Sequence, residues 1–446
     1  MSRDLTNGAI TKELILFSLP MMAGNFLQQL YNIADTVIVG RVVGANALAA
    51  VGSAYALMTF LFSVFMGLAM GAAALFSIYW GRGDMESFRC AVAQAFRLTL
   101  CITLVLNVAV YLFLPEILNF LQIPELLYED MRIYLEIIFG GILATFLYDF
   151  LACLLRAAGD SVTPLIFLAV AAVLNIGLDL LLILRFSLGI AGAGIATVVA
   201  QYVAGVGLGV YTLCRRSSLL PQKHHWRHNR RIMTEIRELS LLTSMQQSAM
   251  NFGILLVQRL VDSFGPVTMA AFAAAVKIDT FAYLPVQDFG NAFSTFVAQN
   301  YGAENTERIH RGLRRATLVS VVFSCMVSLL VFVLAPQLMG LFVSGGETAV
   351  IASGVGYLRI EGACYAGIGC LFLLYGFYRG IKKPGMSLLL TVISLGLRVF
   401  LAYALCGVLG ENGIWIAIPI GWLAADLTGY GYYMLRGKIL RKPSRF

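Results

Sequence analysis

Long apolar stretches dominate the chain, and short polar segments separate them. A helix needs ~20 apolar residues to cross a bilayer, and several of these stretches are longer than that. They are too long for the strands of a membrane barrel. Because backbone groups in lipid must bond within their own segment, helices are predicted. The twelve predicted spans lie near residues 14–40, 47–79, 90–114, 132–153, 163–184, 189–213, 239–261, 267–298, 316–335, 348–378, 385–407 and 412–435.

The overall composition agrees with a membrane protein. Of the 446 residues, 59% are hydrophobic and only 13% are charged, whereas a soluble domain has about 25% charged residues. The eight cysteines lie in or beside apolar runs and show no metal-ligand spacing such as CxxC. We interpret them as small buried apolar residues. The composition therefore indicates a polytopic membrane protein that lies in the bilayer.

The basic residues are distributed unevenly along the chain. Most Lys and Arg residues lie at the N-terminus, in every second loop and in the C-terminal tail. By the positive-inside rule these parts face the cytoplasm, so we expect a plasma (inner) membrane protein with both termini cytoplasmic. The longest basic segment, 215–237, is interpreted as a cytoplasmic linker rather than a nucleic-acid site. It divides the chain into an N-lobe (1–214), the linker and a C-lobe with its tail (238–446).

The two halves of the chain resemble each other. The segment 79–89, YWGRGDMESFR, resembles 300–310, NYGAENTERIH, and 189–199, GIAGAGIATVV, resembles 410–420, GENGIWIAIPI; both pairs are offset by 221 residues. Six helices per half, each half starting on the same side, make a parallel repeat with its axis along the membrane normal. The predicted fold is an all-α membrane protein with twelve transmembrane helices in two pseudo-symmetric six-helix lobes.

Two carboxylates lie at matching depth in the first half. Asp35 comes six residues before Arg41, and Asp179 comes six residues before Arg185. Each arginine marks the outer end of its helix, so both carboxylates lie ~9 Å inside the membrane. Asn175 is one turn deeper than Asp179 on the same face. Thr197 is eight residues past Gly189, so it lies ~12 Å in.

These four oxygen-bearing side chains predict an ion-binding layer. The first half has no Lys or Arg at that depth, and two unpaired carboxylates are costly to keep ionised in a low dielectric. We expect one carboxylate to take up a proton, or a small cation such as Na⁺ to bind between Asp35, Asn175, Asp179 and Thr197. The alternative is structural, because an intramembrane Asp can cap a helix break and Asn can bond a neighbouring helix.

The second half has intramembrane charges of both signs. The bases are Lys277, Arg359 and Arg398, and the acids are Asp279, Asp288 and Glu361. A balanced ion-pair network explains this set. The alternative is a substrate site or second proton site at Asp279 or Glu361.

Several motifs resemble the multidrug and toxic compound extrusion (MATE) family, of the Firmicute-type branch. They are LYNIADTVIVGR…GANALAAVG at 30–52, LLRAAGDSVTP at 154–164, NIGLD at 175–179, GIAGAGIAT at 189–197 and AQNYGA at 298–303. The resemblance implies a MATE/MOP-flippase-like fold and export of cationic, amphiphilic drugs in exchange for protons or sodium. It places an acidic site in the N-lobe at the four residues above, with Tyr134 beside it.

The chain departs from the family in the seventh span. The sodium-coupled NorM-like branch has a glutamate there, whereas this chain has Gln246, Gln247 and Gln258, with no acid before Asp262. This favours the N-lobe as the coupling site. Gln28, Gln29, Gln246 and Gln247 are candidates to line the substrate cleft, and interhelical bonding is the alternative for them.

The predicted function is a secondary antiporter that exports small organic cations by alternating access. It needs no cofactor beyond the coupling ion, H⁺ or Na⁺, and a monomer is a sufficient transport unit. One alternative is a lipid-linked saccharide flippase of the same superfamily, although such a protein would need basic rather than acidic cavity residues. An enzyme is not expected, because no nucleophile–base set is present and all four histidines (His224, His225, His228 and His310) lie in loops.

Overall fold

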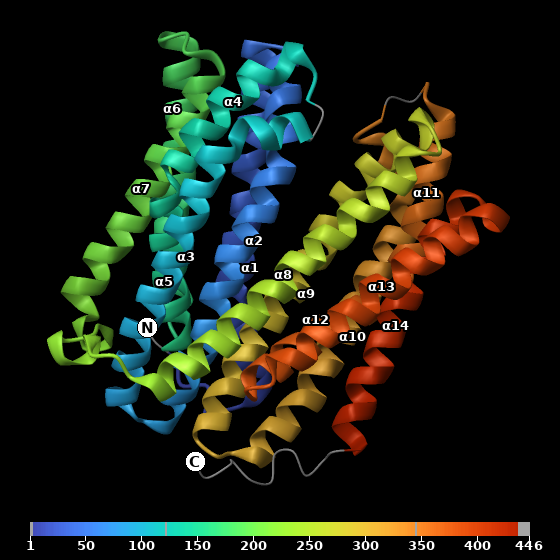
Figure 1. Ribbon diagram of the computed structural model, residues 1–446. Helices are drawn as coiled ribbons and strands as arrows, with labels where there is room; N and C mark the ends of the chain where they lie inside the picture. The colour runs from blue at the N-terminus through green and yellow to red at the C-terminus, as the bar shows by residue number, and fades with distance from the viewer. Residues whose placement is uncertain (1–2, 121–122, 344–345, 436–446) are drawn as a thin grey trace. The chain divides into compact units, whose positions relative to one another are not determined.

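The computed structural model describes residues 3–120, 123–343 and 346–435, and within these ranges the chain is helical, with no strand (Figure 1). The predicted all-α fold is therefore confirmed for the described part of the chain. The basic tail predicted after residue 435 lies outside the described residues.

The first half contains six of the predicted spans. Two of them continue into a π-helical turn, and one consists of two helices joined at a bend. The elements are α1 (Ile10–Ile38) with η1 (Val39–Val43), α2 (Ala45–Arg82), α3 (Met85–Phe120), α4 (Glu125–Gly140) with α5 (Ile142–Ala157), α6 (Val162–Asp179) with η2 (Leu180–Arg185), and α7 (Gly189–Arg215).

Two short 3₁₀ turns follow α7, and then the second half repeats the pattern of six spans. The 3₁₀ turns are η3 (Ser217–Leu219) and η4 (Lys223–Trp226). The spans are α8 (Arg230–Asp262), α9 (Pro266–Gly302), α10 (Thr306–Gly340), α11 (Thr348–Gly362) with α12 (Tyr365–Gly380), α13 (Pro384–Leu409) and α14 (Glu411–Leu435).

Each predicted span corresponds to one helix or one bent pair. Seven helices are long and apolar enough by themselves to cross a membrane, and the two bent pairs also pass this test. The three that do not pass are α1, α8 and α14. Polar residues lower the hydropathy of these helices, for example Gln28, Gln29 and Asn32 in α1 and Gln246, Gln247 and Asn251 in α8. The described residues thus contain the twelve predicted spans.

The bend in the fourth span of each half supports the internal repeat. The axes of α4 and α5 are bent by 47° at Gly141, and the axes of α11 and α12 are bent by 52° next to Cys364. At Gly141 a β-carbon would lie 2.6 Å from the side chain of Val198. Only glycine therefore lets α7 approach the bend this closely.

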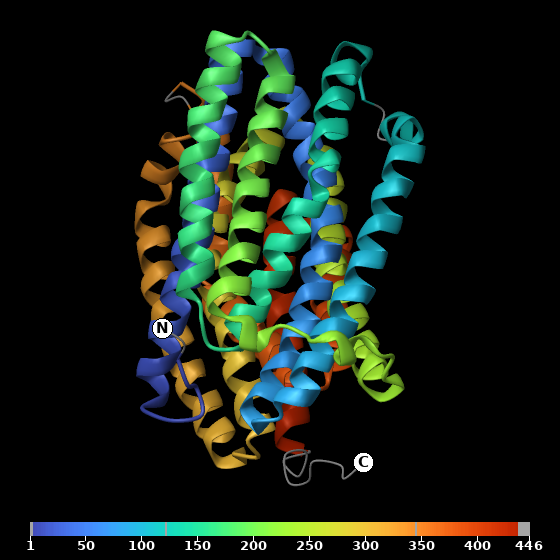
Figure 2. The ribbon, with the colours of Figure 1, turned by 90° about the vertical axis from the view of Figure 1, so that its left-hand side faces the viewer.

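The chain divides into two compact units. The first holds Leu19–Trp80 and Asp84–Ser244, together with Arg3. Within it, α7 packs against α4, α5 and α6, and Figure 2 shows α6 and α7 running side by side. Its core includes a cluster of aromatic rings in which Phe76 and Phe96 both pack edge-on against Phe150.

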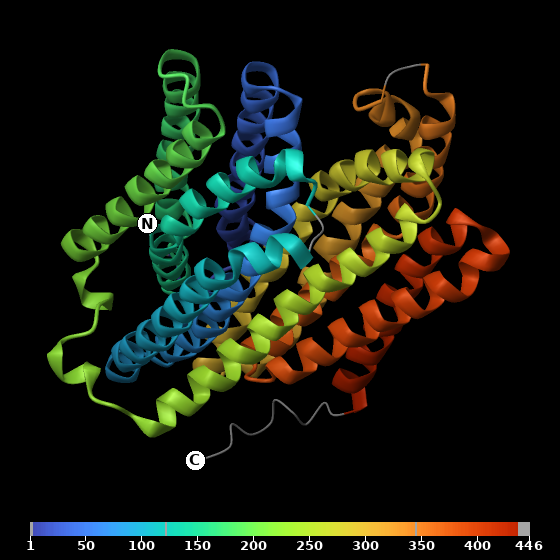
Figure 3. The ribbon, with the colours of Figure 1, turned by 45° about the horizontal axis from the view of Figure 1, so that its top comes forward.

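The second unit holds Asp4–Ser18, Gly81–Gly83 and the described part of the chain from Met245 onward. In it α9 packs against α12, and α13 packs against α14, as Figure 3 also shows. The unit boundaries lie inside α1, near the end of α2 and inside α8. The predicted division at 214 and 238 is not tested by this arrangement and stays a prediction.

The N-terminal residues dock against α9 and α10 of the second unit. Leu5 is completely buried, and its backbone N–H donates to Gln299 Oε1 at 3.3 Å. The Arg308 guanidinium donates to the carbonyl oxygens of Asn7 at 2.6 Å and Gly8 at 2.8 Å. These bonds satisfy backbone groups just before α1 begins.

Large apolar side chains are exposed along several helices. Val173 on α6, Leu329 on α10 and Phe400 on α13 are each at least two-thirds exposed. In water such apolar surfaces are unfavourable. On helices of membrane-spanning length they are the surface that lipid chains cover.

Candidate ion-coupling site

Asp35 and Asp179 are both buried in the first unit. Asp35 is 8% exposed and Asp179 is fully buried. Among the described residues, Asp35 Oδ1 and both carboxylate oxygens of Asp179 have no hydrogen-bond partner. The two side chains lie within electrostatic reach of each other. Two neighbouring buried carboxylates without a partner are unfavourable when both are ionised, so the pair favours binding of a proton or a cation.

A π-helical turn follows each carboxylate. η1 begins four residues after Asp35, and η2 begins directly after Asp179. The two turns contact each other. π-helical turns are rare and occur mostly at functional sites. The sequence does not predict these turns, because an apolar segment has the same composition in an α-helix and in a π-helix.

Asn175 and Thr197 join the layer from neighbouring helices. Asn175 is 2% exposed, and its Nδ2 donates to Thr197 Oγ1 at 3.4 Å. Asn175 Oδ1 has no partner among the described residues. This leaves an amide oxygen, in addition to the carboxylate oxygens, that is able to bind a proton donor or a small cation.

Tyr134 on α4 lies beside the same layer. It is 4% exposed and within electrostatic reach of both Asp35 and Asp179. Gly194 on α7 packs against α4 here: a β-carbon at this position would be in ordinary contact with the Tyr134 ring at 3.5 Å and closer to Ile137, at 3.0 Å. The structure thus brings together the five residues predicted for the site; their role in ion binding stays a prediction.

The second unit has its own buried charged cluster. Asp279 is 2% exposed and accepts hydrogen bonds from the hydroxyl groups of Tyr357, at 2.6 Å, and Tyr365. Glu361 shares a hydrogen bond with Asp279, and Arg398 lies within electrostatic reach of both. Two carboxyl groups share a hydrogen bond only when one of them is protonated. The shared hydrogen bond fits the second proton site, and Arg398 is a base of the predicted ion-pair network that lies near these acids. Both interpretations stay predictions.

Tyr357 and Tyr365 were not among the site residues predicted from the sequence, although the sequence contains a signal for them. Tyr357, Glu361 and Tyr365 follow one another at four-residue spacing, which in the continuous helix predicted over 348–378 would place them on one face. In the structure Tyr365 follows the bend between α11 and α12, and its hydroxyl group still reaches Asp279. Arg359, by contrast, points to another face and lies over the ring of Phe332 at 5.4 Å.

The four glutamines proposed for the substrate cleft differ in their surroundings. Gln28 is exposed and its side chain bonds Tyr31, and Gln29 is half-buried. Gln246 is buried and donates to the sulfur of Met250 at 3.2 Å. Gln247 is half-buried, and its backbone carbonyl accepts from Asn251. Their predicted contact with substrate is not tested by these positions.

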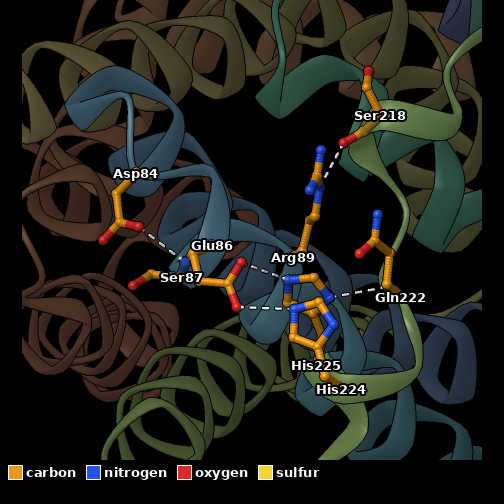
Figure 4. A network of polar contacts seen from close by, with 8 residues as sticks. All are labelled: Asp84, Glu86, Ser87, Arg89, Ser218, Gln222, His224 and His225. Carbon is orange, nitrogen blue, oxygen red and sulfur yellow. Dashed lines mark hydrogen bonds and ion pairs between the residues drawn. The ribbon is translucent and has the colours of Figure 1, made fainter.

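A third polar cluster lies at the start of α3, where the linker docks. Both oxygens of Glu86 accept hydrogen bonds at 3.1 Å, one from Nε2 of His224 and one from Nε2 of the buried His225 (Figure 4). The linker is also held by Arg89, which donates to Ser218 O at 2.8 Å, and by Arg97, which donates to Trp226 O at 2.7 Å. These hydrogen bonds therefore hold the predicted linker against the first unit.

The same three side chains resemble a metal site, since their ligand atoms lie within 4.8 Å of one another. The hydrogen bonds argue against metal binding. His225 Nδ1 accepts the backbone N–H of Gln222 at 3.0 Å, so Nε2 carries the ring proton that Glu86 accepts. A metal ion would need the lone pair of His225 Nε2, so the ring proton would have to move to Nδ1. Metal binding would therefore break the hydrogen bonds of His225 to Glu86 and to Gln222. The geometry fits linker docking better than metal binding.

Comparisons with known proteins agree with this fold and with the repeat. The family model described as MatE matches the chain twice, at residues 20–181 and 243–404. The probable multidrug resistance protein YpnP of Bacillus subtilis is 29% identical over 434 residues, which cover 96% of each chain.

Two solved structures share the fold over 98% of each chain at 22% identity. One is the outward-facing conformation of a multidrug resistance MATE family transporter of the MOP superfamily, with a TM-score of 0.93. The other, with a TM-score of 0.92, is a MOP superfamily transporter from Pyrococcus furiosus, for which a binding pocket of reverse polarity suggests a different function. Because the MatE model covers most of the chain, in two copies that match its internal repeat, this protein belongs to the MatE family of membrane transporters.

Proposed function

We propose that the protein is a secondary active multidrug efflux antiporter that exports cationic, amphiphilic compounds in exchange for H⁺ or Na⁺. The family membership and the name of the relative YpnP support multidrug efflux. The charge of the proposed cargo follows from one observation: Asp35 and Asp179 are both buried, lie within electrostatic reach of each other and have no basic partner among the described residues.

The proposed mechanism is competition for this negative charge. A buried carboxylate pair is stabilised by one cationic species at a time, so the coupling ion and the organic cation exclude each other. Alternating access then carries the two in opposite directions. α1 is suited to transmit the change, because Ile10–Ser18 belongs to the second unit and Leu19–Ile38 to the first. Pro20, which removes one helical hydrogen bond, lies at that boundary.

The proposal extends to location and assembly. The basic loops favour an inner-membrane protein with both termini in the cytoplasm. No cofactor is proposed beyond the coupling ion, and the internal repeat makes a monomer a sufficient transport unit. We do not propose a catalytic activity.

A lipid-linked saccharide flippase is the alternative within the superfamily, and it is not favoured. Such a protein moves an anionic headgroup, which calls for Lys and Arg in the cavity. The fold alone does not show whether the cargo is cationic or anionic, because a transporter with a binding pocket of reverse polarity has the same fold. The acidic layer of the first unit favours a cationic cargo.

The test is transport of a fluorescent organic cation in proteoliposomes under an imposed pH or sodium gradient. We expect one gradient to drive transport in the wild type, and Asp35→Asn and Asp179→Asn each to reduce it at least tenfold. The exposed acid Glu129, which pairs with Arg132 on α4, provides the control Glu129→Gln, with wild-type rates expected. No transport under either gradient, or full transport in both site variants, would contradict the proposal.

A further inference from the structure

Asp149 on α5 is an intramembrane carboxylate that the proposed site does not include. It is half-buried and lies seven residues before Arg156, so it is ~10 Å from the end of the helix that carries this arginine. By the positive-inside rule that end faces the cytoplasm. Asp149 therefore lies toward the opposite membrane face from Asp35 and Asp179, within the same unit.

A line of polar side chains along α7 and α5, here called the file, leads from the layer of Asp35 and Asp179 to Asp149. Gln201 is one turn from Thr197 on α7, and its Oε1 accepts a hydrogen bond from Thr145 Oγ1 on α5 at 2.5 Å. Thr145 is one turn from Asp149 on the same face of α5. The file therefore runs from Asn175 and Thr197 to Asp149 with one direct contact between the helices.

Close packing of α5 and α7 keeps this contact in place. Gly205, one turn beyond Gln201, lies against the backbone of α5; a β-carbon at this position would be 2.6 Å from the carbonyl oxygen of Ala144. Ala144 directly precedes Thr145. The missing side chain at Gly205 is thus what brings Gln201 within bonding distance of α5.

A second connection runs along α1. Tyr31 is one turn from Asp35 and lies within electrostatic reach of both Asp35 and Asp149. Among the described residues, the titratable and charged groups near Asp149 include Tyr31 on α1 and, on its own helix, Arg156, Tyr148 and Cys153, the last one turn from Asp149. The Tyr148 hydroxyl already donates to the carbonyl oxygen of Pro164, at 3.0 Å. Arg156 Nε is buried without a partner among the described residues.

We propose that Asp149 is the inner coupling residue: it receives the coupling cation from the Asp35–Asp179 layer and releases it on the side of Arg156. This inference rests on the proposed antiport function. For a proton, the O–H bond at an outer carboxyl breaks and one at Asp149 forms, and the proton then passes to water. For Na⁺, the ion exchanges one set of oxygen ligands for another. Arg156 compensates the charge of Asp149 when no cation is bound.

The experiment compares Asp149→Asn with wild type in two assays. One assay measures gradient-driven transport of a fluorescent cation in proteoliposomes, and the other measures equilibrium binding of the same dye. We expect binding within twofold of wild type and gradient-driven transport reduced at least tenfold. Asp149→Glu, which keeps a carboxylate, should recover a large part of the transport.

Two further variants separate coupling from a structural role. Thr145→Val removes the helix-to-helix contact of the file and should slow gradient-driven transport several-fold. Thr99→Val is the control, because among the described residues the Thr99 hydroxyl bonds only within α3, to Ala95 O at 2.7 Å and Phe96 O at 3.4 Å. If Asp149 only balances Arg156, the double variant Asp149→Asn/Arg156→Gln should regain transport, which would overturn the inference.

The outcomes also separate this inference from the proposed function. Wild-type transport in Asp149→Asn, alongside normal gradient-driven transport in the wild type, would overturn the inner coupling role alone. A wild type without gradient-driven transport would overturn the antiport function and this inference with it.

Discussion

Asn175 Nδ2 lies 3.4 Å from Thr197 Oγ1, and this contact joins α6 to α7 within the acidic layer. It orients the Asn175 amide so that Oδ1 remains without a partner among the described residues. An interhelical hydrogen bond in a membrane contributes only ~0.6 kcal/mol on average. The contact therefore matters more for the position of the Asn175 side-chain oxygen, which we propose as an ion ligand, than for stability.

The first prediction concerns this contact. Thr197→Val keeps the side-chain shape but removes the hydroxyl group. We expect thermal stability in detergent to change little and the concentration of coupling ion that gives half-maximal transport to rise several-fold. An unchanged ion dependence would mean that Thr197 only bonds Asn175.

The second prediction concerns Gly205, where α5 and α7 meet. A methyl group there overlaps the carbonyl oxygen of Ala144, and overpacking of this kind costs about 1–3 kcal/mol. Gly205→Ala should lower the midpoint of thermal unfolding. The control is Gly52→Ala on α2, where a β-carbon meets nothing within 4 Å. That substitution should leave the midpoint unchanged or raise it slightly, because alanine favours a helix. Equal midpoints in the two variants would contradict the prediction.

The third prediction concerns the turn before α6. The buried Asp160 accepts hydrogen bonds from Thr163 N at 3.1 Å and from Thr163 Oγ1 at 2.9 Å, and it pairs with Arg216 at 3.1 Å. Asp160→Ala removes a cap and a charged hydrogen bond, a loss of about 3 kcal/mol. Asp84 also caps a helix, through Ser87 N at 3.0 Å. Asp84→Ala should cost only about 1 kcal/mol.

Thermal unfolding of the purified variants checks this comparison. The Asp160 variant should unfold at a clearly lower temperature than the Asp84 variant. A larger effect for Asp84 would mean that the pairing with Arg216 contributes little.

The fourth prediction concerns the docked linker. His225 is buried, accepts the backbone N–H of Gln222 and donates to Glu86, so His225→Ala removes both anchors. The exposed basic residues of the linker should then be cut faster by trypsin, several-fold or more. His228→Ala, at an exposed position of the same segment, should leave the cleavage rate unchanged.

Zinc provides a second check of the linker. If the Glu86 cluster docks the linker rather than holding a metal, neither Zn²⁺ nor a chelator should alter the wild-type cleavage rate. Protection by Zn²⁺ that is lost in His224→Ala would show that the tautomer assignment is wrong.

The pattern of residues along the chain predicts the twelve spans and the depth of their charges. Apolar stretches of bilayer length satisfy their backbone only as helices, and the fixed rise per residue then sets the depth of each side chain. Asp35, Asn175, Asp179 and Thr197 were selected by that count. The break of the fourth span was not predicted, because the bend depends on how Gly141 packs against Val198 on another helix.

Which side chains meet depends on how the helices pack against one another. The rotation of each helix about its axis and the close approaches at glycines bring Thr145 to Gln201 and the two tyrosines to Asp279. The π-helical turns after Asp35 and Asp179, and the docking of the linker on Glu86, also depend on contacts between segments far apart in the chain. The depth of a side chain in the membrane follows from the geometry of its own helix. Its contacts follow from the packing of several helices, which the sequence of one segment does not specify.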